Sequence, residues 1–172
     1  MKDPNPTEVP TTPSQNDGNA VQDSQSNRKA IAVLNDLIET SKDGEKGFAR
    51  AAKDSNDPAL ISLFSESKRS CHVAVAELQD QVKLLGGNPE DGGSMTAAIH
   101  RGWISLKSLA TSRDSRAILE ECERGEDYAK ARYAEAVKRV LPEPVRVLIE
   151  RQYQRVVTNH DRVRDLRNRY RA

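Results

Sequence analysis

Apolar residues recur every three or four positions along most of this chain, and breaks containing proline, glycine or short polar runs interrupt the pattern. This spacing places apolar side chains on one face of a helix. Asp57, directly before Pro58, is suited to cap one of these helices. The predicted helices cover about residues 28–55, 58–85, 94–110, 115–140 and 143–170. The sequence therefore predicts an all-α protein with four long helices and a short one between the second and third long helices.

Residues 1–27 differ from the rest of the chain because they are rich in Pro, Ser, Thr, Asn, Gln and Asp. Few of these side chains can bury the apolar surface that offsets the entropy of an ordered backbone. The total length of 172 residues suits one domain. We therefore expect a disordered N-terminal tail over 1–27 and one helical domain over 28–172.

The lengths of the connections predict how the helices are arranged. The connections "NDP" and "LPEP" are short, so each joins two antiparallel neighbours. The short helix would span roughly 25 Å at about 1.5 Å per residue, which is enough to carry the chain back along the bundle. The second and third long helices are then parallel, as in a ferritin-like four-helix bundle with one crossover. An up-and-down array of five helices is the alternative.

Composition supports a helical fold and narrows the possible functions. Hydrophobic residues make up 36% of the chain, aromatic residues 4% and charged residues 31%, whereas β proteins use more β-branched and aromatic residues. The net charge of +1 argues against a dedicated nucleic-acid binder, which neutralises phosphates with a basic surface. The sequence contains no signal-peptide-like stretch and no run of about 18 apolar residues. We therefore expect a cytoplasmic protein without a membrane segment.

The last predicted helix carries an arginine stripe, formed by Arg151, Arg155, Arg162 and Arg169. We interpret this stripe as a solvated face that exchanges salt bridges with neighbouring helices. A docking surface for an acidic protein, nucleic acid or anionic lipid is the alternative. Because no aromatic residues interleave with the arginines on this flank of the helix to stack on bases, we expect a protein partner or self-association rather than a nucleic-acid partner.

A helical projection predicts a polar layer in the core, made of Glu45, Cys122, Glu126 and His160. Folding the helices at their loops brings these four residues within about one helical turn of each other. His160 is then the expected partner of Glu126. Glu123 lies at the edge of the line of core-facing residues on this predicted helix, and its side chain can reach into the core. Glu120, Glu121 and Asp127 are expected to keep the helix soluble.

Carboxylates and an imidazole at one level of a bundle also suit a metal site. Di-iron bundles use single glutamates on two helices and Glu-x-x-His pairs on the other two. Here Ser67 and Val156 stand where two of the glutamates are needed, which argues against a dinuclear oxidase. A single Fe, Mn or Zn ion held by Glu45, Glu126 and His160, with Cys122 as a weaker fourth ligand, is the remaining option. The simpler interpretation, without a cofactor, is a hydrogen-bonded cluster that fixes the helix register.

No complete catalytic motif occurs in the sequence, whether a nucleophile elbow, a phosphate-binding glycine loop or HExxH. Cys71 and Cys122 occupy core positions, where a thiol behaves as a small apolar group. The leading hypothesis is a soluble, non-catalytic structural, interaction or stress-associated module. The alternative is a metal-binding or metal-dependent redox protein.

The short predicted helix contains the one tryptophan, Trp103, which we expect to anchor this helix against the bundle. His100, Arg101 and Lys107 surround it in the sequence. These three cationic or titratable side chains could instead form an anion site or a partner site.

Three stretches, "LNDLIETSKDGEKGF", "HRGWISLK" and "AILEECERGEDYA", resemble in this order a bacterial family of hypothetical proteins, domain of unknown function 2383. The resemblance covers about residues 28–170 and implies a ferritin-like four-helix bundle. It implies no activity and no cofactor. The positions it points to are Glu45, His100, Arg101, Trp103, Lys107, Cys122, Glu123, Gly125 and Glu126.

Overall fold

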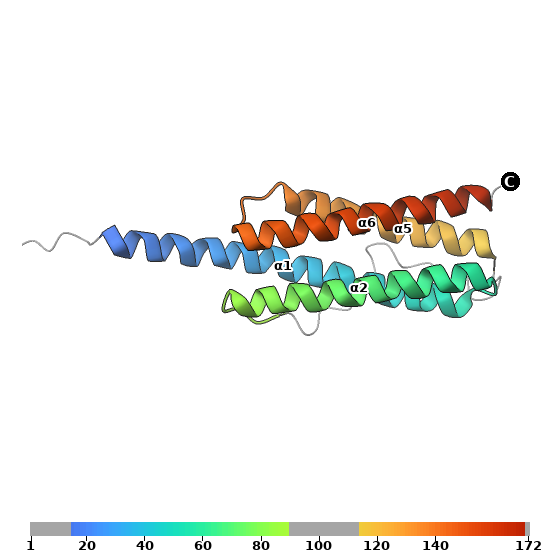
Figure 1. Cartoon of the computed structure of the whole chain (residues 1–172), viewed down its shortest axis with the longest axis horizontal. Coiled ribbons are helices and arrows are strands. Elements are labelled where there is room, and N and C mark those ends of the chain that lie inside the picture. Colours follow the sequence, from blue (N-terminus) through green and yellow to red (C-terminus); the bar gives the residue numbers. More distant parts are fainter. Residues whose placement is uncertain (1–14, 90–113, 171–172) are drawn as a thin grey trace, which may run out of the picture.

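A computed structural model of the chain describes residues 15–89 and 114–170. Within these ranges the protein consists of helices without strands, so the predicted all-α four-helix bundle is confirmed (Figure 1). The helices are α1 (Gln15–Asp54), α2 (Pro58–Leu84), α5 (Ser115–Val137) and α6 (Glu143–Arg169). The short helix predicted over 94–110 lies outside the described residues.

Helix ends follow the local signals in the sequence. Asp57 caps α2 as predicted, since its carboxylate accepts a hydrogen bond from the backbone N–H of Ala59 at 2.8 Å. Asp114 caps α5 in the same way, through Arg116 N at 3.0 Å. After α2, Gly86 takes a φ of 78°, in the left-handed region that favours glycine. These caps fix where the two central helices begin and where α2 stops.

The helices form two antiparallel hairpins, α1 with α2 and α5 with α6 (Figure 1). Figure 1 also shows that α2 and α5 run in the same direction along the bundle. This confirms the parallel course predicted for the second and third long helices. Within the described ranges, none of the helices is long and apolar enough to cross a membrane.

The first helix begins earlier than the sequence pattern predicts. It starts at Gln15 rather than at Arg28, so the prediction of a disordered tail is wrong for residues 15–27. Asp23, Ser24 and Gln25 are exposed, and this part of α1 extends past the ends of α2 and α6 (Figure 1). Adding residues to an existing helix costs far less free energy than nucleating one. A polar segment can therefore continue a helix that packing has already nucleated.

The core contains two apolar clusters with a polar layer between them. One cluster includes Leu34, Ile38, Leu78, Tyr133 and Ile149, and the other includes Phe48, Phe64, Ile118, Cys122 and Val163. Phe48 and Phe64 stack with their ring centroids 6.2 Å apart. Between the clusters the buried side chains are small or polar, for example Ser41 on α1 and Ser67 on α2. A polar layer is therefore present near the predicted level, and it positions the candidate site.

Candidate functional site

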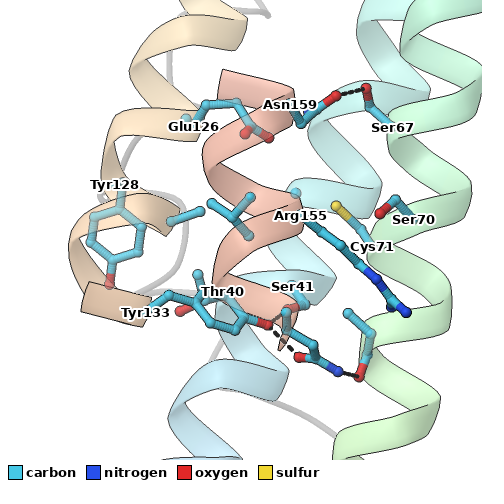
Figure 2. Close-up of a pocket in the computed structure, with 16 residues that line it drawn as sticks. Thr40, Ser41, Ser67, Ser70, Cys71, Glu126, Tyr128, Tyr133, Arg155 and Asn159 are labelled. Carbon is cyan, nitrogen blue, oxygen red and sulfur yellow. Dashed lines mark hydrogen bonds between the residues drawn. The ribbon is translucent and has the colours of Figure 1, made fainter. Parts of the chain in front are cut away.

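The four helices line a cavity of about 40 Å³ within the polar layer (Figure 2), and this cavity is partly open to solvent. Small side chains account for the cavity, because they leave space at a level where larger ones would fill the core. A water-sized molecule needs about 10–15 Å³, so the cavity can hold a few such molecules. Its walls include Ser41 and Gly44 of α1, Ser67, Cys71 and Ala74 of α2, Gly125, Glu126, Ala129 and Tyr133 of α5, and Gln152, Val156 and Asn159 of α6.

Glu126 faces the core as predicted and is only 5% exposed. Its carboxyl is hydrogen-bonded to the side chain of Asn159, whose Oδ1 accepts a hydrogen bond from Ser67 Oγ at 2.8 Å. The other carboxyl oxygen, Oε2, is buried without a hydrogen-bond partner among the described residues. Burial raises the pKa of Glu126 to about 7; the Asn159 hydrogen bond opposes this rise, and the charge of Asp127 adds to it. Glu126 therefore exchanges its proton near neutral pH.

A second set of polar groups, the cross-helix chain of Ser41, Tyr133, Gln152 and Glu77, joins all four helices. Tyr133 of α5 donates a hydrogen bond to Gln152 Oε1 of α6 at 2.8 Å. Ser41 Oγ of α1 must then donate to the Tyr133 hydroxyl oxygen, 3.0 Å away. The Gln152 amide donates to Glu77 Oε2 of α2 at 2.8 Å. Burial raises the pKa of Tyr133, so its hydroxyl remains a donor at neutral pH.

His160 is buried as predicted, with 5% of its surface exposed, but its partners are two aspartates. Its Nε2 lies 2.8 Å from Asp127 Oδ1, and its Nδ1 lies 3.1 Å from Asp161 Oδ1. The prediction that His160 pairs with Glu126 is therefore wrong. Asp127 was expected to point away from the core, yet its carboxylate contacts the imidazole from the exposed side of α5. The hydrogen bond from His160 is the main cause that lowers the pKa of Asp161.

Glu45 lies at the edge of the α1–α2 interface rather than in the core. Its side chain is 28% exposed, and its Oε1 lies 3.2 Å from Nδ1 of His72. The core-facing position belongs to its neighbour Gly44, which is buried. A Cβ atom on Gly44 would lie 3.0 Å from Cys71 Sγ, so α1 and α2 approach closely here. The prediction of Glu45 in the core layer is wrong because that layer has no room for a glutamate on this face of α1.

Both cysteine thiols have low reactivity. Cys122 is fully buried and Cys71 is half-buried. Burial raises the pKa of each thiol, and the charge of Glu126 raises both further. Neither side chain is therefore a thiolate at neutral pH, and both have the low reactivity of buried cysteines.

Two further acidic residues of α5 form ion pairs, and one of them lies differently from its predicted position. Glu121 was expected on the soluble face, but it is only 1% exposed and forms an ion pair with Arg124. Glu123 reaches in from the edge, as expected, and pairs with Arg167 Nη2 at 2.8 Å. The side chains of this second pair are 14% and 17% exposed, respectively. Glu123 therefore joins α5 to the last turns of α6 and does not face the cavity.

In the described part of the chain, no group of three or more His, Cys, Asp or Glu side chains is placed to hold a metal ion. Glu45 pairs with His72, Glu126 with Asn159, and His160 with Asp127. The convergence predicted for Glu45, Glu126, His160 and Cys122 is therefore not found. His100, Arg101, Trp103 and Lys107 lie outside the described residues, and the roles expected for them stay predictions.

The arginine stripe of α6 exchanges ion pairs with α2, as interpreted from the sequence. Arg151 and Arg155 bond the two carboxylate oxygens of Glu77 at 3.0 Å and 3.3 Å, respectively. Arg162 bonds Glu66 at 3.0 Å. Three of the four arginines therefore have acidic partners on the neighbouring helix.

Sequence patterns alone missed the roles of Gln152 and Asn159 on α6. Both amides connect buried groups, Tyr133 in one case and Glu126 in the other. A signal was present, because a buried tyrosine hydroxyl or carboxyl needs a hydrogen-bond partner. The amide side chains beside the core-facing residues of α6 could supply this hydrogen-bond partner.

These features define the class of protein: an all-helical four-helix bundle with a hydrogen-bonded polar layer that includes Glu126, a carboxyl whose pKa is raised by burial. The sequence matches the family described as Domain of unknown function (DUF2383) over residues 29–139. The chain therefore belongs to this family. The match covers α2 and α5 with the cavity residues they carry, and it ends before α6. No curated protein matches the sequence.

Proposed function

We propose that this protein is a non-catalytic, ferritin-like four-helix module that acts as a structural or protein-interaction component. The cross-helix chain carries this proposal, because it uses core hydrogen-bonding groups to hold four helices together. Glu45, Glu126 and His160 add support, since each is bonded to a separate partner. A catalytic site would require such groups to converge on one reacting centre.

The helix directions support the ferritin-like part of the proposal. A bundle with one long crossover requires its second and third long helices to be parallel, and α2 and α5 run in this way (Figure 1). The two cysteines, Cys71 and Cys122, are both free thiols. This state supports a cytoplasmic location, because thiols stay reduced in that compartment.

One end of the bundle supports an interaction role. Leu84, where α2 ends, is 79% exposed, and Val140, between α5 and α6, is 98% exposed. A surface groove runs beside Val140 and Leu141 and is bordered by Arg132 and Glu135. Exposed aliphatic side chains with a charged rim are typical of protein contact sites.

Elemental analysis tests the non-catalytic proposal against the metal-dependent alternative. The full chain would be purified without chelator and compared with the Glu126→Ala variant. We expect no stoichiometric Fe, Mn or Zn in either protein. One equivalent of such a metal in the wild type that disappears in the variant would refute the proposal, provided that circular dichroism shows both proteins to be folded.

Light scattering after size-exclusion chromatography tests the interaction surface. We expect the wild-type chain to self-associate as its concentration rises and the Leu84→Asp/Val140→Asp variant to remain monomeric. The control is Ile61→Asp, because Ile61 is also exposed on α2 but lies near the other end of this helix. Equal masses for all three proteins over the whole concentration range would contradict a role in self-association.

A further inference from the structure

Several hydroxyl groups in the wall of the core cavity donate their protons to other groups of the protein. The Ser67 hydroxyl can direct its proton to Leu63 O or to Asn159 Oδ1. The Thr40 hydroxyl donates to Asp36 O at 2.9 Å, and Ser41 donates within the cross-helix chain. A hydroxyl oxygen keeps lone pairs after its proton is committed. The wall of the cavity therefore presents oxygen atoms whose protons point elsewhere.

Glu126 adds an acceptor that lacks a partner in the described part of the chain. Its Oε2 is buried and has no hydrogen-bond partner among the described residues, while Asn159 bonds the same carboxyl group. Figure 2 shows Glu126, Asn159 and Ser67 on the same side of the cavity. An ionised carboxylate can only accept hydrogen bonds, so this site lacks a donor or a positive charge.

We propose that the cavity binds one small monovalent cation of ammonium or potassium size, held by Glu126 and the hydroxyl oxygens of the wall. The volume of about 40 Å³ admits water-sized species and excludes bulky organic cations. One carboxylate matches one positive charge, whereas a divalent ion requires more anionic ligands. This site goes beyond the proposed interaction function and does not depend on it.

Nearby charges permit this binding. Arg155 lies at the cavity wall, where its guanidinium bonds Glu77 at 3.3 Å and shares that carboxylate with Arg151. The other groups that act on Glu126 or share its surroundings are Asp127, Cys122 and Tyr133 of α5 and Cys71 of α2, with Glu45 of α1 acting on Cys71. The thiols and Tyr133 are neutral, and the charge of Asp127 acts on Glu126 in the direction that favours a cation beside it.

Thermal unfolding of the full chain in three salts tests the proposal. Ammonium chloride, potassium chloride and tetramethylammonium chloride would be compared at equal concentration and at about pH 8, where the Glu126 carboxyl is mostly ionised. We expect ammonium or potassium to raise the Tm by about 5–10 °C over tetramethylammonium at about 100 times the Kd. The Glu126→Gln variant should lose this difference. Glu120→Gln, which removes a charge from α5 outside the cavity, should keep it.

A measurement on the wild type makes the test independent of the fold of the variant. The apparent pKa of Glu126, followed by the ¹³C shift of its carboxyl, should be lower in ammonium or potassium chloride than in tetramethylammonium chloride. An effect of ammonium alone would assign the binding to its N–H donors, and an effect of both ions would assign it to charge and size. Equal Tm values and equal pKa values in all three salts, or the same salt effect in Glu126→Gln, would overturn the proposal and leave a cavity that holds water only.

Discussion

The cross-helix chain predicts a specific loss of stability when the hydroxyl of Tyr133 is removed. Tyr133→Phe keeps the ring in the core but leaves Gln152 Oε1 and Ser41 Oγ without their partner. A serine in a helix can turn its hydroxyl back to a carbonyl in the preceding turn, whereas Gln152 is only 1% exposed. A buried acceptor left unsatisfied costs about 1–3 kcal/mol. We therefore expect the free energy of unfolding to fall by about 2 kcal/mol, and the Tm by about 4–8 °C.

Urea unfolding followed by circular dichroism measures this change. Tyr128→Phe on the same helix is the matched control, because Tyr128 is only half-buried, and it should cost less than about 0.5 kcal/mol. The double variant Tyr133→Phe/Gln152→Met removes both partners and fills the same space, so it should be more stable than the sum of the two single losses predicts. The expected coupling is about 1 kcal/mol or more. A Tyr133→Phe cost no larger than the control, or strictly additive losses, would refute the chain as a link between helices.

Three further predictions follow from the polar layer. Because burial raises the pKa of Glu126 from an ordinary 4.5 to about 7, the folded state binds more protons than the unfolded state in this window. The free energy of unfolding of the wild type should therefore fall by up to roughly 3 kcal/mol as the pH rises through the raised pKa of Glu126. The urea midpoint of the wild type should fall with pH by more than that of Glu126→Gln. Gly44→Ala should stabilise α1 by about 1 kcal/mol in a Cys71→Ala background, but by less in the wild type, where the new Cβ meets Cys71 Sγ; thermal unfolding of the four proteins checks this. Cys122 should react with iodoacetamide at least about 100 times more slowly in the folded protein than in urea, as measured by mass spectrometry.

Helical periodicity was sufficient to predict the four long helices and much of the core. The α5 residues Ile118, Cys122 and Tyr133 are buried along one line, as their spacing requires, and Glu126 lies among them. The hairpins followed from short loops, and the parallel course of α2 and α5 followed from the long connection. These features depend on local sequence, which is why the sequence of one chain was enough to predict them.

The partners across the layer could not be predicted in the same way, because they depend on helix rotation and on close approach. A rotation by a fraction of one residue decides whether Gly44 or Glu45 faces the core, and the contact of Gly44 with Cys71 settles it. His160 meets Asp127 rather than Glu126 because its imidazole reaches from the core to the exposed carboxylate of Asp127. A helical projection assigns a face to each residue but does not describe such reach.

The stability of the bundle does not explain why a glutamate occupies the position of Glu126. A glutamine at this position could accept the Asn159 hydrogen bond through its carbonyl and turn its amide toward the oxygen-rich wall of the cavity. It would remove the free-energy cost of ionising a buried carboxyl, so stability alone gives no reason for a glutamate here. A negative charge becomes favourable only when a positive species occupies the cavity. The stability difference between the wild type and Glu126→Gln above neutral pH should therefore depend on the salt: it should favour the variant in tetramethylammonium chloride and narrow or reverse in ammonium or potassium chloride.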